Sequence, residues 1–298
     1  FDILTRNLSQ ATLNTYIDYD TNYLKEATTT ANVPSPKKYE RKSDLQFRCG
    51  PAVELVEAGG DEDFVPGHAV FFQAPLGICQ EPSLVGLDRL LCGRGYFVQF
   101  SNDSFFRPPF LPPGQLRNRY RLMEFCPPAE KNLIYAGGGT PWYIGAGAPM
   151  DTDENPLNLS LNRPVADNII TLIISPRKES AETSINGSVS FNSRDVAIDP
   201  TDTQASAQGT QHLLPPMLKI VLVAIDEKSA ERLSNFDENP TPPLSGPLGR
   251  FNGTVGTEGK DSDLDDAVEA LKTELVGLRV NFRVFTTTVQ IRGSRWSM

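Results

Sequence analysis

The sequence predicts an α+β fold in which a mostly antiparallel β-sheet carries a few helices. Strand patterns dominate, and the stretches HAVFFQAP (68–75) and MLKIVLVAI (217–225) are nearly continuous apolar runs, typical of strands covered on both faces. One segment, 263–277, has a clear helical period. No internal repeat of fixed period occurs, so a repeat architecture is not predicted.

The first element is a helix. Phe1, Leu4, Leu8 and Ala11 recur at spacings of three and four residues, so they share one face, which we expect to dock on the rest of the fold. No capping residue precedes Phe1. We therefore expect the helix to begin upstream of this sequence, with residues 1–11 as its C-terminal end.

The remainder, 12–298, is predicted to form one globular domain rich in strands. Its first strand is 13–19, where the apolar period changes to two. Residues 21–43 are polar, contain two prolines and lack periodicity, which predicts a long loop. A short strand over 45–50 follows, and then the strand 68–75.

The segment SLVGLDRLLC (83–92) places four leucines on one side, which predicts a short helix packed on the sheet. Ser83 is its expected N-cap, and Gly93 its expected C-terminal stop. The next segment, YFVQF (96–100), is predicted to be a strand.

Four prolines and three phenylalanines then interrupt regular structure in SNDSFFRPPFLPPG (101–114). Two interpretations exist for Phe105, Phe106 and Phe110. A loop pinned to the core by aromatic anchors is favoured over an exposed partner-binding patch.

The strand RNRYRLMEF (117–125) places Arg117, Arg119 and Arg121 on one face, because alternate residues of a strand point the same way. A plain solvated face is favoured over an anion-binding site.

Residues 127–164 show little periodicity, which predicts a second long loop. The most hydrophobic strand candidate is ADNIITLIIS (166–175). Asn186 and Gly187 are typical of a hairpin turn, and 194–211 is again polar and loop-like.

The last third is the most regular part of the chain. The strand 217–225 is expected to be buried, and Asp226 is expected to cap a short helix over 227–233. A linker rich in proline and glycine leads to the helix 263–277. The apolar face of that helix consists of Leu264, Val268, Leu271 and Leu275.

Ser262 and Asp265 match a capping box at the start of that helix, and Gly277 is its expected end. The strand VNFRVFTTTVQIRG (280–293) follows and is rich in β-branched residues. Its apolar set shifts from one parity to the other, which predicts either a bulge or burial on both faces.

Charge and composition exclude some classes of function. The 298 residues carry a formal net charge of -9, with a pI near 4.9, so a nucleic-acid partner is not predicted. No run of about 18 apolar residues occurs that would span a bilayer.

The cysteines do not resemble a zinc site. Cys49, Cys79, Cys92 and Cys126 lack C-x-x-C spacing, and the chain contains only two histidines to assist them. In an oxidising compartment four cysteines permit three pairings, among which the sequence does not choose. Free buried thiols are the alternative.

No catalytic constellation emerges. His68 and His212 both have the sequence setting of histidines at strand edges, and no nucleophile elbow, metalloprotease, Walker or kinase motif is present. The glycines at 137–139 and the pair Gly145 and Gly147 are followed by proline and do not open a helix, so a flexible loop is favoured over a phosphate site. We therefore predict no catalytic residues.

Calcium is the one metal for which a candidate exists. The acidic run 261–266 begins like a calcium loop, but glycine is missing at its sixth position and Lys272 stands at its twelfth, so helix capping is favoured. Asp151, Asp153 and Glu154 are a weaker candidate, for a loop-type calcium site. No other cofactor is predicted.

The opening residues carry a family resemblance. FDILTRNLSQATLNTYIDYD resembles the exit from the long N-terminal helix of pilin-like proteins, with an Arg-x-Leu-x-Gln-Ala segment before the first strand. Together with HAVFFQAPLG, GYFVQF, FRPPFL, RYRLMEF, MLKIVLVAIDEKSAERL and RVFTTTVQIRGSRWSM, it resembles verrucomicrobial cassette proteins with a prepilin-type cleavage and methylation leader. More distantly, the chain is similar to the minor pseudopilins of type II secretion, particularly the J-type subunit.

This resemblance implies a truncated pilin-type helix packed on a β-sheet head. It further implies a non-enzymatic structural subunit of a cell-envelope assembly that works in protein secretion. Its partners would be other pilin-like subunits. The full-length protein would be held in the bacterial inner membrane by the missing N-terminal helix, with the head in the periplasm, and the present chain would be a soluble fragment. The leader, the glycine–phenylalanine cleavage junction, the glutamate used in pilin assembly and the apolar half of the helix are absent from these residues.

A second hypothesis comes from another class. The aromatic loops at 105–110 and at Trp142 and Tyr143 are also typical of a secreted carbohydrate-binding module or a hydrolase. Aromatic side chains exposed in a groove would favour this alternative, and buried ones would not.

Overall fold

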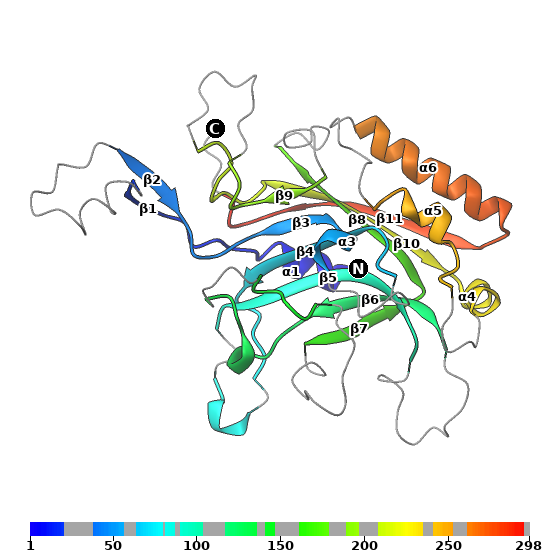
Figure 1. Cartoon of the computed structure of the whole chain (residues 1–298), viewed down its shortest axis with the longest axis horizontal. Coiled ribbons are helices and arrows are strands. Elements are labelled where there is room, and N and C mark those ends of the chain that lie inside the picture. Colours follow the sequence, from blue (N-terminus) through cyan, green and yellow to red (C-terminus); the bar gives the residue numbers. More distant parts are fainter. Residues whose placement is uncertain are drawn as a thin grey trace, which may run out of the picture.

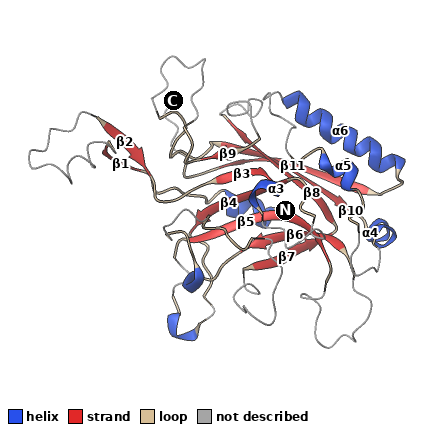
Figure 2. Cartoon of the chain, viewed as in Figure 1, coloured by secondary structure: helices blue, strands red, loops and turns tan. Residues whose placement is uncertain are grey.

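The fold is built mainly from antiparallel strands, with helices at the periphery (Figures 1 and 2). The structure, a computed structural model, describes residues 1–20, 38–56, 64–79, 81–86, 90–103, 117–135, 141–146, 161–178, 189–196, 208–234, 241–252 and 261–294. Mixed helices and antiparallel sheets confirm the α+β class. No helix among these residues is long and apolar enough to cross a membrane.

The largest sheet has six strands in the order β7-β6-β5-β4-β3-β9, and all of its neighbouring pairs are antiparallel. Its strands are β3 (Arg48–Pro51), β4 (His68–Ala74), β5 (Cys92–Ser101), β6 (Arg119–Phe125), β7 (Asn162–Asp167) and β9 (Phe191–Asn192). Every residue of β4 and β6 is buried, as the long apolar run of β4 predicts.

A second sheet has three antiparallel strands in the order β11-β10-β8. They are β8 (Ile169–Arg177), β10 (Met217–Ile225) and β11 (Phe282–Gln290). The prediction of a buried strand over 217–225 is confirmed, because β10 lies in the centre of this sheet and is largely buried.

The two sheets pack on each other through β8, which contacts β3, β4, β5 and β6. His68 Nδ1 accepts a hydrogen bond from the Ile174 amide (3.0 Å), and Gly67 forms a parallel bridge with Leu172. Gly67 has φ +81°, and a Cβ at this position would lie 2.5 Å from the Leu172 carbonyl oxygen, so the close approach of the sheets requires glycine.

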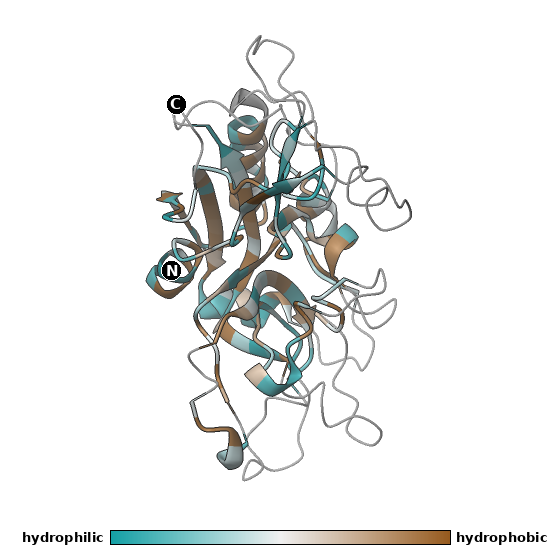
Figure 3. Ribbon diagram, turned by 90° about the vertical axis from the view of Figure 1, so that its left-hand side faces the viewer, coloured by the Kyte–Doolittle hydropathy of each residue, from teal (hydrophilic) through white to brown (hydrophobic). Residues whose placement is uncertain are grey.

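Both sheets and the helices share one hydrophobic core (Figure 3). The helices are α1 (Asp2–Leu8), α3 (Ala52–Leu55), α4 (Glu227–Leu233), α5 (Ser245–Gly249) and α6 (Asp261–Gly277), with 3-10 turns η1 (Pro82–Leu84) and η3 (Ala129–Lys131). The predicted apolar face of α6, namely Leu264, Val268, Leu271 and Leu275, is buried, and the helix ends at Gly277 as predicted.

The helix α6 covers one face of the three-stranded sheet, and Figure 1 shows it running along β11. Lys219 of β10 donates to Asp265 Oδ1 of α6 at 2.8 Å, so the Asp265 carboxylate binds a lysine of the sheet. The predicted Asp226 cap is confirmed, since its Oδ1 accepts from the Ser229 amide of α4 at 2.9 Å. The side chain of Ser262 lies outside the described residues.

Three predicted elements are wrong. The segment 83–92 contains no α-helix in its described residues: η1 ends at Leu84, and Cys92 and Gly93 already belong to β5, because pairing with β4 overrides the leucine spacing. The predicted loop over 21–43 contains β2 (Tyr39–Lys42), which pairs with β1 (Tyr16–Tyr19) in a projecting ribbon. The predicted loop over 127–164 contains η3 and the start of β7.

The predicted irregularity of the last strand is also wrong. The strand β11 pairs with β10 in unbroken register from Phe282 to Gln290, so there is no bulge between them, and most of its residues are exposed. The reason is its position, because an edge strand has a neighbour on one side only.

Candidate functional site

The N-terminal helix α1 is the feature to which both the sequence and the resemblance point. Of its predicted docking face, Leu4, Leu8 and Ala11 are 3%, 0% and 1% exposed and belong to the common core. The fourth residue, Phe1, is 39% exposed. The helix is therefore seated along most of its apolar side, and its first residue reaches the surface.

A buried polar chain also fastens α1 to the six-stranded sheet. Asn7 Nδ2 donates to the Tyr96 hydroxyl oxygen (2.8 Å), and the Tyr96 hydroxyl donates to Glu124 Oε1 (2.7 Å). Glu124 also forms ion pairs with Arg94 (3.6 Å) and Arg163 (2.5 Å). Burial, reinforced by the Glu124 charge, raises the pKa of Tyr96, so the hydroxyl stays protonated and keeps its role as donor.

The end of α1 is tied to the second sheet. The Ser9 carbonyl accepts from the Arg292 amide (3.1 Å), just beyond β11, and the Thr12 amide donates to the Gln73 carbonyl of β4 (2.9 Å). A Cβ on Gly293 would lie 2.7 Å from the Ala11 carbonyl oxygen, so only glycine lets the chain pass there. The helix is thus held by both sheets.

An exposed apolar patch lies beside the start of α1. The ring centroids of Phe1 and Phe285 are 6.0 Å apart, and each residue is 39% exposed, while Ile3 is 54% exposed. We call these three residues the Phe1–Phe285 patch. Phe1 and Ile3 come from the start of the chain and Phe285 from β11, so folding brings exposed apolar residues from both ends of the chain to this region.

A shallow pocket of about 210 Å³ adjoins the patch at Phe285. Its lining residues are Ala224, Ile225, Asp226, Asn281, Phe282, Arg283 and Phe285. Hydrogen bonds from Ser229 and Asn281 lower the pKa of Asp226, so the lining of the pocket includes a carboxylate as well as the Arg283 side chain. A lining that combines apolar side chains with charged ones suits an apolar side chain of a protein partner.

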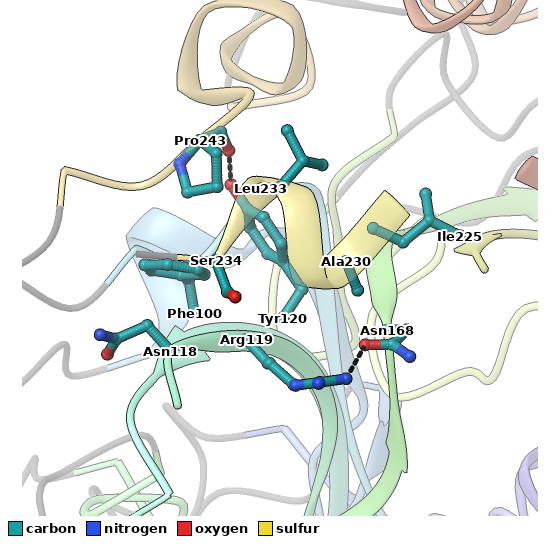
Figure 4. Close-up of a pocket in the computed structure, with 10 residues that line it drawn as sticks. All are labelled: Phe100, Asn118, Arg119, Tyr120, Asn168, Ile225, Ala230, Leu233, Ser234 and Pro243. Carbon is teal, nitrogen blue, oxygen red and sulfur yellow. Dashed lines mark hydrogen bonds between the residues drawn. The ribbon is translucent and has the colours of Figure 1, made fainter. Parts of the chain in front are cut away.

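The prediction of a solvated arginine face is wrong for Arg119 and Arg121, which are buried, whereas Arg117 is exposed. Arg119 donates to Asn168 Oδ1 (3.1 Å; Figure 4). It also donates to Glu227 Oε2 (2.7 Å), and its second terminal nitrogen lies 2.6 Å from Glu227 Oε1. Hydrogen bonds from Arg119 and then Asn168 lower the pKa of Glu227 to about 2. The Glu227 side chain is itself 55% exposed.

The small pocket around this cluster, about 10 Å³, has room for one water molecule at most and does not suit a substrate. Arg121 is buried as well: its Nε lies 3.1 Å from Asp167, and its Nη1 donates to the Ser101 carbonyl. The partner carboxylates are Asp167 of β7 and Glu227 of α4. Both lie far from Arg119 and Arg121 in sequence, so the sequence of the strand alone does not predict these ion pairs.

The ring of His68 links the two sheets, whereas His212 lies in a turn. His68 is fully buried between the sheets, and burial lowers its pKa to about 4, so the ring is neutral at physiological pH. His212 has φ 58° and is partly buried, and burial and neighbouring cations lower its pKa. No serine or cysteine hydrogen bond to either ring is present among the described residues, so neither has the geometry of a catalytic base.

All four cysteines are free thiols in this structure. Cys49, Cys92 and Cys126 are buried, and burial raises the pKa of each, to about 12 for Cys49, so none is an activated thiolate. Cys79 is partly exposed and donates to the Leu84 carbonyl at 3.2 Å.

Several predicted site residues lie outside the described residues. These are Phe105, Phe106 and Phe110 of the aromatic loop and Asp151, Asp153 and Glu154 of the calcium candidate. Within the described ranges no group of three or more histidine, cysteine, aspartate or glutamate side chains is placed to hold a metal ion.

The other aromatic pair, Trp142 and Tyr143, is buried at 4% and 6% exposure. Tyr143 stacks on Phe71 with ring centroids 4.4 Å apart. These rings therefore anchor a loop on the sheet and form no aromatic groove for a carbohydrate.

Sequence reasoning missed Ile3 and Phe285, which complete the exposed patch. The available signal for Phe285 is the shift of parity in 280–293, because Phe285 is the first apolar residue of the second parity. Comparisons with known proteins add no constraint, since no family model, no curated protein and no solved structure matches this chain.

Proposed function

We propose that the chain is the head of a non-enzymatic, pilin-like subunit, similar to minor pseudopilins, in a type II secretion or filament-like assembly of the bacterial cell envelope. The observation that carries the proposal is the seat of α1, an amphipathic N-terminal helix with Leu4 and Leu8 buried in the core and Phe1 and Ile3 at the surface. The resemblance of the opening residues to the helix exit of pilin-like proteins supports it.

In this function the helix links two environments. Upstream residues would anchor the subunit in the inner membrane, and the head would lie in the periplasm. A force on the helix would reach both sheets through hydrogen bonds. Asn7 is hydrogen-bonded to Tyr96 of the six-stranded sheet, and the Ser9 carbonyl accepts from the Arg292 amide beside the three-stranded sheet. Such a firm joint is what a subunit needs when neighbouring helices pack against it in a filament.

Neighbouring pilin-like subunits are the proposed partners, and the Phe1–Phe285 patch is their proposed contact. An apolar surface beside a pocket with a charged rim is typical of protein–protein contacts, where an apolar centre is surrounded by polar groups. The patch includes Phe1, at the N-terminal end of α1. In a filament, the helix of a neighbouring subunit would pass close to this end.

The test is expression of the gene with its natural upstream coding sequence in a bacterial host. We expect the product in the inner-membrane fraction, and an intact mass that shows removal of a leader and methylation of the new N-terminus. A full-length product that is entirely soluble and unprocessed would overturn the proposal.

The contact is tested separately, by crosslinking the membrane form to its neighbours. Ile3→Glu and Phe285→Glu place charges in the patch and are expected to lower the yield of crosslinked species by about tenfold or more. The matched control is Val85→Glu, at a residue outside the patch that is 85% exposed. Equal crosslinking of all three variants would contradict the assignment of the patch.

A further inference from the structure

The edge of β11 exposes a row of backbone hydrogen-bonding groups. The Ile291 amide donates to the Pro216 carbonyl, and the Asn281 carbonyl accepts from the Asp226 amide, so odd-numbered residues of this segment face β10. Because the two sides of an antiparallel strand alternate, the even-numbered residues direct their N–H and C=O groups away from the sheet. These residues are Phe282, Val284, Thr286, Thr288 and Gln290.

The same alternation shows where the edge is covered. The Arg292 amide, which is also even-numbered, donates outward to the Ser9 carbonyl at the end of α1. From Phe282 to Gln290, no backbone partner on the outer side occurs within the ranges that the structure describes. Thr286, Thr288 and Gln290 are exposed. The helix therefore covers one end of the edge, and the outward groups of the five even-numbered residues of β11 have no backbone partner among the described residues.

The edge lacks the usual protection against strand pairing. Natural edge strands carry prolines, several charges or bulges. In contrast, β11 contains no proline, its register with β10 is unbroken, and Arg283 is its one charged residue.

We propose that two copies of this chain pair through β11, strand against strand and antiparallel, about a two-fold axis at Thr286. The two three-stranded sheets then become one continuous sheet with the order β8-β10-β11-β11-β10-β8. This inference goes beyond the proposed function and does not depend on it.

The sequence of β11 complements itself in this register. The outward-facing residues meet each other, so every open amide and carbonyl of one copy has a partner in the other. Thr286 lies opposite Thr286 of the second copy, Val284 opposite Thr288, and Phe282 opposite Gln290. Pairs of threonines and of β-branched residues favour antiparallel pairing.

Charge also favours a second copy. Arg283 lies opposite Val289 of the other chain, so the one charge of each strand does not face its equivalent. Phe285 lies opposite Thr287, on the face that carries Phe1, because odd-numbered side chains share one face of the sheet. Pairing therefore brings the two Phe1–Phe285 patches to the same face of the joint sheet.

The test begins with the oligomeric state of the 298-residue chain, measured by sedimentation equilibrium over a range of concentrations. We expect a reversible monomer–dimer equilibrium. Thr286→Pro removes one outward N–H without breaking a bond to β10, and it should weaken the dimer by at least about tenfold. Thr286→Ala keeps the amide and should stay within about threefold of the unaltered chain.

A second pair of variants does not rely on proline. Thr286→Lys places two lysines opposite each other at the axis, whereas Thr288→Lys places each lysine opposite Val284. Like charges directly opposite destabilise a strand pair, so Thr286→Lys should dissociate the dimer more than Thr288→Lys. Circular dichroism checks that every variant is folded.

Crosslinking tests the register. In a Cys79→Ser background, which removes the partly exposed native thiol, Thr286→Cys should be linked across the axis by a short bis-maleimide. Phe282→Cys should not, because its two copies would be about 26 Å apart along the strands. A chain that is monomeric at all concentrations, equal crosslinking at both positions, or pairing of β11 with a different protein's strand would each overturn the proposal.

Discussion

Tyr96 joins the N-terminal helix to a buried ion pair. Its hydroxyl accepts from Asn7 and donates to Glu124, and both partners are buried. A phenylalanine would fill the same space but would leave both of these polar groups short of a hydrogen bond, and an unsatisfied buried group costs more than the bond itself contributes.

We therefore expect Tyr96→Phe to lower the free energy of unfolding by about 1–3 kcal/mol. The measurement is urea denaturation followed by circular dichroism. Tyr135→Phe, at a tyrosine that is 68% exposed, is the matched control and should change stability by less than about 0.5 kcal/mol. Equal stabilities of the two variants would show that the hydroxyl does not hold α1.

His68 makes stability depend on pH. Its pKa is lowered from 6.5 to about 4 by burial, so the unfolded chain takes up a proton as pH falls through 6.5 while the folded chain does not. The neutral ring therefore contributes to the free energy of unfolding above pH 6.5. This contribution, up to about 3 kcal/mol, is lost as the pH falls toward 4.

Two measurements check this. The free energy of unfolding should decrease as pH falls from 7 to about 5. In an NMR titration the ring resonances of His68 should not move over the same range. A midpoint near the ordinary histidine value would show that the ring is accessible to protons, contrary to its place between the sheets.

At the scale of elements, local sequence patterns correctly predicted the helices and strands whose structure depends mainly on their own residues. The helix α6 has a long apolar face and a glycine end, and β4 and β10 are apolar runs too short for a buried helix. The segment 83–92 was misjudged because leucine spacing favours a helix, whereas pairing of Cys92 with Ala74 places its end in β5. Such pairing is not visible in a local window.

The candidate site divides in the same way. The buried residues of α1 follow from spacing, and the carboxylates that pair with Arg119 and Arg121 do not, because α4 and β7 bring them from distant parts of the chain. Similarly, Phe285 joins Phe1 only when β11 lies beside α1. Contacts between elements remote in sequence are thus what the sequence alone did not predict.

The start of α4 supplies a pH-dependent joint between the sheets. Asn168 is the residue at which the chain passes from β7 to β8, and Glu227 binds both Asn168 and Arg119. The pKa of Glu227 is lowered from 4.5 to about 2, so its stabilising effect is present above pH 4.5 and is lost as pH falls toward 2.

We expect the unaltered chain to lose more stability between pH 5 and pH 3 than Glu227→Gln does. Because the carboxylate is more than half exposed and solvent screens it, the difference should be about 1 kcal/mol, well below the full linkage value. Urea denaturation at the two pH values measures it. Glu269→Gln, in an exposed pair with Lys272 on α6, is the control and should retain the pH dependence of the unaltered chain.

At the scale of the whole molecule, the two sheets depend on one core. The buried residues of α1, α6 and both sheets form a single hydrophobic cluster, and β8 contacts four strands of the six-stranded sheet. A shared core of this kind makes separate unfolding of either sheet unfavourable, since each would expose the apolar face of the other.

Leu271→Ala tests this cooperativity, because it perturbs α6 beside the three-stranded sheet while the signal comes from the six-stranded sheet. Leu271 is 0% exposed, and its truncation should lower the free energy of unfolding by about 2–5 kcal/mol. The readout is Trp142, which packs on Phe71 and Phe125 of the six-stranded sheet and becomes the only tryptophan in a Trp296→Phe background. Its fluorescence and the circular dichroism should shift to the same lower denaturant midpoint.

The control is Val276→Ala, at a residue of α6 that is 66% exposed, and it should change neither denaturant midpoint. If the circular dichroism shifted while the Trp142 midpoint stayed in place, the three-stranded sheet and its helices would be an independent folding unit.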